Sequence, residues 1–152
     1  RRLPGRGAWC HVAAGCIDAL AKRPAALQRA LRGAVQAETL AADVRAWLSR
    51  RIKDGLSLAW AARSAVVGQE RMLEAMAADG VACIAISNDI SNRTLRALKA
   101  GARSSVNFIE VPYSSAELGA LLGGELYAAV GILSGPGTNN VRLRLQQWSA
   151  LG

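Results

Sequence analysis

Cysteine and histidine are scarce in this chain, and their scarcity excludes two kinds of construction. Among 152 residues there are three cysteines, at positions 10, 16 and 83, and one histidine. Three scattered cysteines cannot form a disulfide framework, which is typical of a reducing, cytoplasmic environment. A structural zinc site needs four ligands, and no second Cys or His pair supports Cys10, His11 and Cys16. We therefore expect no disulfide framework, no metal and no other cofactor.

Long apolar runs and catalytic constellations are also missing. Hydrophobic residues make up 51% of the chain, yet no apolar run approaches the roughly 20 residues that a membrane span needs. The sequence offers no carboxylate pair and no nucleophile with an adjacent base, so we expect no enzyme. The chain begins with Arg1 in place of methionine, so we expect it to be a fragment with residues upstream.

Positive charge is present in excess, and it is concentrated in one third of the chain. The net charge is +8, from 19 Lys and Arg against 11 Asp and Glu. Residues 1–51 hold ten of the cations and three of the acids, a net charge of +7, and the remaining residues carry +1. Such a field attracts a polyanion, and nucleic acid is the natural partner. The alternative is a basic surface that serves solubility only.

The segment Pro4-Gly-Arg-Gly-Ala-Trp9 is the main candidate site. Two glycines allow the backbone to approach a partner closely, the guanidinium of Arg6 remains free, and Trp9 offers a stacking face. The same residues are also typical of a glycine turn that leads into a strand. Basic helix faces downstream extend the surface. The residues predicted to bind RNA are Arg1, Arg2, Gly5, Arg6, Gly7, Trp9, Lys22, Arg23, Arg29 and Arg32.

Helical patterns fill the first 62 residues. Residues 13–22 and 24–33 predict two short helices, the second capped by Gly33. An apolar stripe at 3.6-residue spacing then runs from residue 38 to 62, either as one helix bent near Gly55 or as two. We prefer two helices with a domain boundary at Arg50 and Arg51, where two like charges interrupt the stripe. Trp47 and Trp60 would then pack in different cores.

From residue 64 onward short apolar runs alternate with helical segments. We expect strands at 65–67, 81–87, 106–111 and 127–133, with helices after each of them. A capping box at Ser114 and Glu117 opens one of these helices. The alternation predicts an α/β fold: a small, mostly helical, basic lobe (1–51) followed by a three-layer α/β/α sandwich (52–152) with a four-stranded mixed sheet. The turn Gly135-Pro-Gly137 lacks the glycines and lysine of a nucleotide-binding loop.

Residues 1–51 resemble the YlxR family of small bacterial RNA-binding proteins. The resemblance is carried by Leu3-Pro-Gly-Arg-Gly-Ala-Trp9, by Ala19 and Leu27, and by Arg29-Ala-Leu-Arg32. It implies a truncated α+β domain that lacks the family's upstream strands, and RNA contact by the Gly-Arg-Gly segment.

Residues 52–152 resemble the kink-turn-binding ribosomal-protein superfamily in its bacterial YlxQ branch. The matching segments are Gly55-Leu-Ser-Leu-Ala59, Gly68, Ser87-Asn-Asp-Ile-Ser91, Val111-Pro-Tyr113 and Glu117-Leu-Gly119. Where the superfamily has an Asn-Glu pair after the glycine, this chain has Gln69 and Glu70. The resemblance implies a secondary RNA-binding site at Gly68, Gln69, Glu70, Arg71, Val111, Pro112 and Tyr113.

The sequence therefore predicts a non-enzymatic, cytoplasmic, bacterial RNA-binding protein of translation, transcription or RNA processing. We expect it to bind structured RNA, such as ribosomal or another stable non-coding RNA, mainly through the basic lobe. The alternative is a protein-interaction adaptor whose α/β/α domain docks on the ribosome or on RNA polymerase components. Neither hypothesis involves a membrane.

Overall fold

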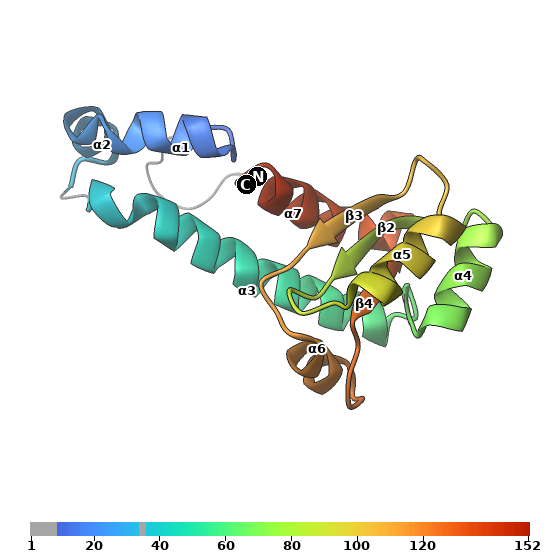
Figure 1. Ribbon diagram of the computed structural model, residues 1–152. Helices are drawn as coiled ribbons and strands as arrows, with labels where there is room; N and C mark the ends of the chain where they lie inside the picture. The colour runs from blue at the N-terminus through green and yellow to red at the C-terminus, as the bar shows by residue number, and fades with distance from the viewer. Residues whose placement is uncertain (1–8, 34–35) are drawn as a thin grey trace.

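A long helix joins a helical N-terminal part to an α/β sandwich in the computed structural model, which describes residues 9–33 and 36–152 (Figure 1). The N-terminal part holds α1 (Ala14–Ala21), α2 (Pro24–Leu31) and the 3₁₀ turn η1 (Ala37–Thr39), and the connecting helix is α3 (Leu40–Ala61). The sandwich contains β1 (Ala65–Val67), α4 (Gln69–Ala77), β2 (Val81–Ile86), α5 (Asn92–Gly101), β3 (Asn107–Glu110), α6 (Ser115–Leu122), β4 (Ala129–Leu133), the turn η2 (Pro136–Thr138) and α7 (Asn139–Ser149).

The four strands form one mixed sheet in the order β1-β4-β2-β3. β4 runs antiparallel to both β1 and β2, and β2 runs parallel to β3 with Ile84 opposite Phe108. A parallel pair needs a crossover connection, which α5 supplies. The predicted α/β fold with a four-stranded mixed sheet is confirmed.

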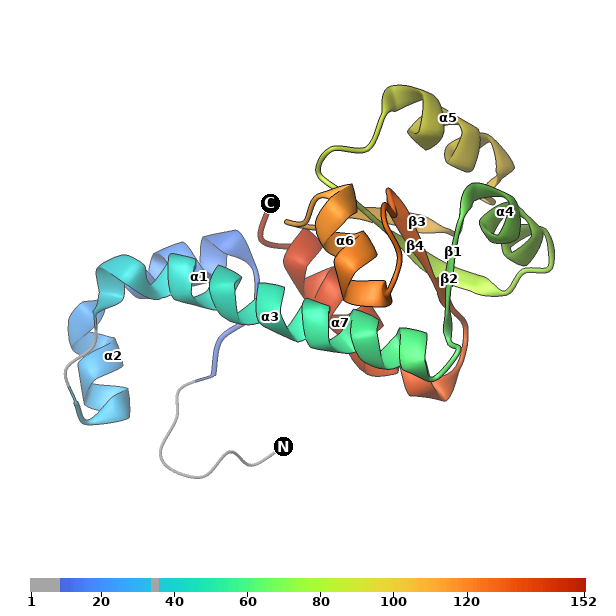
Figure 2. The ribbon, with the colours of Figure 1, turned by 90° about the horizontal axis from the view of Figure 1, so that it is seen from below.

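Helices cover both faces of the sheet (Figure 2). On one face α3, α6 and α7 bury apolar side chains such as Leu56, Leu118 and Leu145 against the strands. On the other face α4 and α5 contribute Met72, Met76 and Leu98. The central strand β2 is buried along nearly its whole length because it lies between two helical layers.

The start and the end of α6 in the sandwich lie where the sequence predicts them. The Ser114 hydroxyl accepts the N–H of Glu117, whose carboxylate accepts the N–H of Ser114 at 2.7 Å, so the capping box is present. The Ser114 hydroxyl also donates to the Glu117 carboxylate at 3.0 Å. The bond from the Ser114 N–H first, and the bond from its hydroxyl second, lower the pKa of Glu117. Gly123 ends α6 with a φ of +78°. In the N-terminal part the left-handed residue after α2 is Arg32, with a φ of +50°, and not the predicted Gly33.

The prediction of two helices between residues 38 and 62 is wrong, because α3 is one continuous helix. Arg50 and Arg51 are exposed on its outer side, so their charges do not interrupt the buried stripe. Gly55 does not bend the helix but lets α7 approach: a Cβ there would stand 3.0 Å from the Cβ of Val141. The boundary predicted at residue 51 therefore falls inside α3, and the division into two units stays a prediction.

Helix α1 packs on the first half of α3 and on the C-terminal end of the described chain. Ile17 of α1, Leu48 of α3 and Leu151 form a small buried cluster. The N–H of Ala14 donates to the backbone oxygen of Ala150 at 3.2 Å. Arg45 donates from its guanidinium to the backbone oxygen of Leu151 at 2.6 Å. None of the described helices is both long enough and apolar enough to cross a membrane.

Candidate nucleic-acid interface

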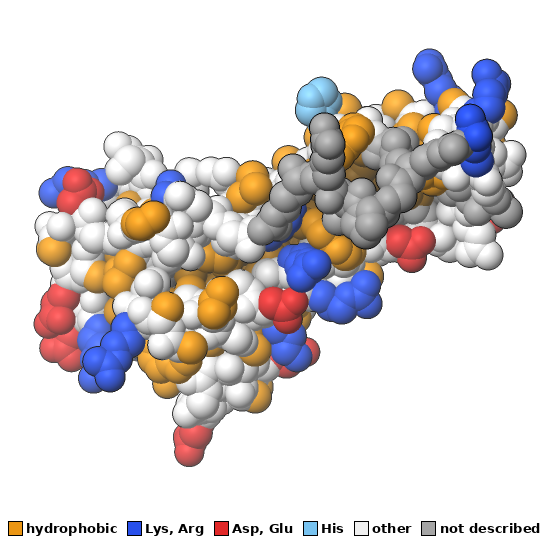
Figure 3. All heavy atoms as spheres, turned by 180° about the vertical axis from the view of Figure 1, so that it is seen from behind, with side chains coloured by type: hydrophobic (Ala, Val, Ile, Leu, Met, Phe, Trp, Pro, Cys, Tyr) orange, Lys and Arg blue, Asp and Glu red, His pale blue; other side chains and the backbone are white. Residues whose placement is uncertain are grey.

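The first candidate surface is basic and lies at the junction of α1 and α2 and along α2. Ile17 and Leu27 are the buried residues of these two helices, so the opposite sides face solvent. Pro24 is the first residue of α2, and it disfavours a helical conformation at Arg23, so α1 and α2 are separate helices. The exposed cations here are Lys22, Arg23, Arg29 and Arg32. Figure 3 shows Lys and Arg side chains gathered at the end of the molecule that α1 and α2 form.

These four cations, which we call the α1–α2 cation surface, form no ion pair with a described acidic group. Within the described residues the ion pairs are Arg51 with Asp54 at 3.9 Å and Arg103 with Asp79 at 3.0 Å. Both involve other parts of the molecule. The α1–α2 cation surface therefore presents its charge to solvent, where a polyanion can meet it.

The Gly-Arg-Gly segment falls largely outside the described residues. This applies to Arg1, Arg2, Gly5, Arg6 and Gly7, so their predicted contact with RNA stays a prediction. Trp9 is described and is 82% exposed. Its indole is therefore available to a partner, as a stacking role requires.

Trp47 lies at a second candidate surface, and the prediction that it packs in a core is wrong. The side chain is 38% exposed on α3. The guanidinium carbon of Arg144, on α7, lies 4.9 Å from the centroid of its ring, and that of Arg51 lies 5.7 Å from it. Trp60, by contrast, is half-buried and packs against the sandwich core, with its ring centroid 6.4 Å from that of Tyr127. Core packing is thus confirmed for one tryptophan only.

The cavity beside Trp47 has a volume of about 480 Å³. We call it the Trp47 cavity. Its lining combines aromatic, cationic and hydrogen-bonding side chains with one glycine: Trp9, Trp47, Arg51, Asp54, Gly55, Leu58, Asn140 and Arg144. Three segments of the chain, the N-terminal residues, α3 and α7, meet there.

Gly68 and Gln69, the first half of the predicted secondary site, line a small groove on the sandwich. Gly68 precedes α4 with a φ of +87°, a conformation that a side chain would strain. The groove also takes in Thr94 of α5 and the segment before β4, where Leu126 is 66% exposed. Glu70 and Arg71 follow on α4 and are exposed.

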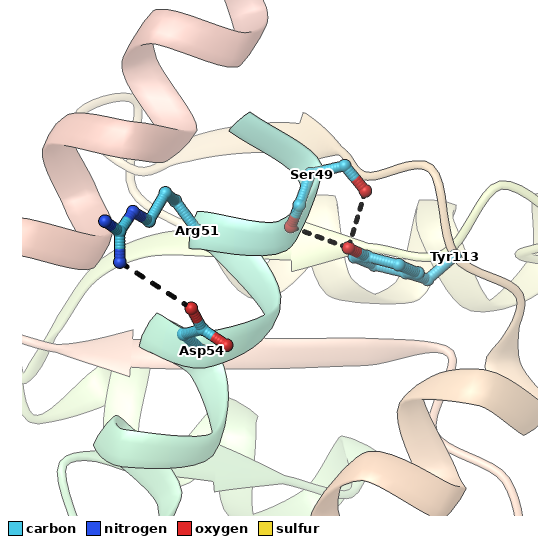
Figure 4. Close-up of polar contacts among 4 residues, drawn as sticks. All are labelled: Ser49, Arg51, Asp54 and Tyr113. Atoms are coloured by element: carbon cyan, nitrogen blue, oxygen red, sulfur yellow. Dashed lines mark hydrogen bonds and ion pairs between the residues drawn. The ribbon is translucent and has the colours of Figure 1, made fainter. Parts of the chain in front are cut away.

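The second half of the predicted secondary site lies elsewhere. Val111 is buried at 1% exposure and lines, with Pro112, a cavity on another part of the molecule. The Tyr113 hydroxyl donates to the backbone oxygen of Ser49 at 2.7 Å and is 2.7 Å from its hydroxyl (Figure 4). Burial raises the pKa of Tyr113 more than its bond to Ser49 lowers it. Gly68 and Gln69 thus line a different cavity from Val111 and Pro112, and RNA contact by either half stays a prediction.

Two features were missed in the sequence. The spacing of Trp47 and Arg51, four residues apart on one helix, is a signal that could have identified a cation–aromatic pair. Arg144 could not have been found this way, because it comes from α7. Leu126 stands in a glycine-rich segment before a strand, and an apolar residue in such a loop is a weak sign of a contact surface.

Comparisons with known proteins identify solved structures with a similar fold and show nothing beyond the fold. No family model matches the sequence, and no curated protein matches it. A Giardia lamblia 15.5kD RNA-binding protein has a similar structure, with a TM-score of 0.56 and 14% identity, over 69% of this chain and 90% of that one. A protein of unknown function from Bacillus halodurans has a TM-score of 0.54 and 22% identity, over 66% of this chain and 96% of that one. At these identities the likeness establishes a shared fold.

Proposed function

We propose that this chain is a non-enzymatic RNA-binding protein that holds structured RNA through its basic N-terminal part. One observation carries the proposal: the α1–α2 cation surface is exposed and is not paired with any described acid. The fold supports it, since the Giardia lamblia protein that shares it is an RNA-binding protein. The net charge of +8 also favours binding of a polyanion such as RNA.

The physical basis is the release of counterions from the RNA backbone. Each cation that neutralises a phosphate frees condensed ions, so affinity falls steeply with salt, with a slope of about −0.7 to −0.9 per contact on a double logarithmic plot. Arginine adds bidentate contacts to phosphate oxygens. Four contacts from the α1–α2 cation surface would contribute a slope of about −3.

The test compares two triple variants that lose the same charge. One carries Lys22→Gln, Arg23→Gln and Arg29→Gln, and leaves Arg32 with its left-handed backbone intact. The matched control carries Arg93→Gln, Arg96→Gln and Lys99→Gln, three exposed cations of α5 in the sandwich. Binding to a fluorescent structured RNA is measured by anisotropy from 50 to 300 mM salt.

We expect the first triple variant to make the salt slope shallower by about 2 to 3, and the control to leave it nearly unchanged. Equal losses in both variants would show that charge acts without regard to position, and the assignment to α1 and α2 would be wrong. Absence of salt-dependent binding by the wild type would refute RNA binding itself.

The RNA that we propose is a stable structured RNA of translation, transcription or RNA processing. The resemblance of residues 1–51 to the YlxR family and of residues 52–152 to kink-turn binders supports this choice. Crosslinking in cells followed by sequencing should recover one or a few abundant structured RNAs. If crosslinking recovers proteins of the ribosome or polymerase and no RNA, the chain is an adaptor instead.

A further inference from the structure

We propose that the Trp47 cavity binds one unpaired nucleobase of the RNA, stacked on the indole of Trp47. The inference rests on the proposed function and adds a second kind of contact to it. The α1–α2 cation surface can hold phosphates of any sequence, whereas an aromatic ring recognises a base that has left its helix.

Trp47 and the two arginines over its ring form a stacking platform, on which an entering base takes the place of one guanidinium. Both guanidinium carbons, of Arg144 and Arg51, lie within 6 Å of the ring centroid of Trp47. A guanidinium is planar and stacks on aromatic rings, and it also forms bidentate contacts to phosphate. One nucleotide can therefore place its base against Trp47 and its phosphate against a neighbouring arginine.

The platform is held in place before any ligand arrives. Arg144 donates a hydrogen bond to the side-chain oxygen of Gln147, one turn further along α7, at 2.8 Å. Helices α3 and α7 are pressed together where Gly55 meets Val141. Trp47 and Arg144 come from these two helices, so their separation is fixed by backbone packing. Preorganisation of this kind reduces the ordering cost of binding.

The edges of the cavity suit a base better than a purely apolar ligand. Asp54 supplies a carboxylate that accepts hydrogen bonds, and the Asn140 amide both donates and accepts. A volume of about 480 Å³ lies in the range of small-molecule pockets. The exposed side chains of Trp9 and Leu58 offer further apolar surface at the cavity. In the sequence Trp9 follows directly on the Gly-Arg-Gly-Ala segment that we expect to contact RNA.

The carboxylate in the cavity is compatible with a nucleobase beside it. The ion pair of Asp54 with Arg51, at 3.9 Å and with both side chains more than half exposed, is weak, so the carboxylate can accept a hydrogen bond from a ligand. A nucleobase carries no negative charge and presents N–H groups at its edge. Its recognition therefore tolerates a carboxylate beside the stacking face, where it accepts a hydrogen bond.

The experiment uses Trp47→Ala, Trp47→Phe and Trp47→Leu in the full chain, with Leu143→Ala as the control. Leu143 is an exposed apolar residue of α7 outside the cavity lining. The probes are a fluorescein-labelled single-stranded A9 RNA and the same RNA with a central 2-aminopurine, whose fluorescence falls when it stacks. Urea unfolding confirms that each variant is folded.

We expect Trp47→Ala to weaken binding of the A9 RNA by about 5- to 150-fold, the usual range for loss of one base–aromatic stack. The salt slope should stay unchanged, because no phosphate contact is removed. Trp47→Phe should keep most of the affinity and the quenching of 2-aminopurine, and Trp47→Leu should lose both. The control should bind as the wild type does.

The inference is overturned if Trp47→Ala binds like the wild type, or if leucine restores binding as well as phenylalanine does. In either case the tryptophan serves only to pack its two arginines. The salt slope of the wild type separates this failure from failure of the proposed function. If binding depends steeply on salt but Trp47→Ala binds A9 RNA as the wild type does, base stacking alone is refuted. If the wild type binds neither A9 RNA nor the structured RNA of the first experiment, both proposals are refuted.

Discussion

Replacing Gly119 by alanine should destabilise the protein, although alanine is the better helix former. Gly119 is buried in α6, where the segment before β4 passes directly over it. A Cβ at this position would overlap the carbonyl oxygen of Glu125, and would stand 2.5 Å from its carbonyl carbon and 2.9 Å from the nitrogen of Leu126. All three neighbours are backbone atoms, so no side chain can rotate away.

The size of the effect follows from two opposing contributions. Alanine in place of glycine inside a helix stabilises it by about 1 kcal/mol. Overpacking in a close-packed site costs about 1 to 3 kcal/mol, and a backbone neighbour belongs at the upper end of that range. The overlying segment is tied to α6 by N–H bonds from Gly124 to the Gly119 oxygen and from Tyr127 to the Ser115 oxygen, both 2.9 Å. Weakening one of them adds about 1 kcal/mol.

We therefore expect Gly119→Ala to lower the free energy of unfolding by about 2 to 3 kcal/mol. At a urea dependence of about 2 kcal/mol per molar, the midpoint followed by circular dichroism should fall by roughly 1 to 1.5 M. Gly15→Ala is the matched control, since Gly15 is an exposed residue of α1 with nothing near its missing Cβ. That change should raise stability by about 0.5 to 1 kcal/mol.

A rise of the midpoint for both variants would refute the reasoning, because helix propensity would then decide the outcome at Gly119 as well. A fall for both would indicate that substitution of glycine is harmful irrespective of contact. Only opposite signs for the two alanines agree with a steric cause at the α6 crossing.

Further predictions concern buried thiol and hydroxyl groups. In the native protein Ellman's reagent should react with the exposed Cys10 and Cys16, and with Cys83 only after unfolding. Burial raises the pKa of Cys83 from 9.0 to about 11, so the folded state holds its proton more tightly than the unfolded chain does. Its contribution to stability should be complete below pH 9 and should disappear as the pH rises toward 11; Cys83→Ala should flatten this decline in urea midpoints, and an unchanged decline would contradict it. Tyr113→Phe removes the bonds to Ser49 and should cost about 1 kcal/mol; adding Ser49→Ala should cost less than the sum of the two single losses, and strict additivity would show that the pair is not coupled.

Local order in the sandwich could be predicted because its signals lie within a few residues of one another. The pair Ser114 and Glu117 defines a helix start through contacts three residues apart. The strand β2 is a continuous apolar run, typical of a strand buried on both faces. The order of the strands in the sheet is not encoded in such short patterns, since β1 and β4 come from opposite ends of the sandwich.

The continuity of α3 was mispredicted because a pair of like charges was interpreted as a helix boundary, and the bend considered at Gly55 is also absent. Arg50 and Arg51 occupy the exposed side of the helix, and Gly55 meets Val141 of α7, a contact that no window of sequence contains. The candidate site divides in the same way. The outward direction of Arg29 follows from the periodicity of α2, but the pairing of Trp47 with Arg144 depends on tertiary packing.

The unbroken α3 sets the distance between the N-terminal helices and the sandwich. Its 22 residues span about 33 Å. Near one end of the helix Leu40 packs against the N-terminal cluster, and near the other end Ala59 is buried in the sandwich core, so both ends are held in place. A ligand bound at the α1–α2 cation surface is consequently held at one distance and one angle from the sheet. A partner that contacts both this surface and the sandwich must carry its two contact points at that fixed spacing. The length of α3 therefore selects among partners.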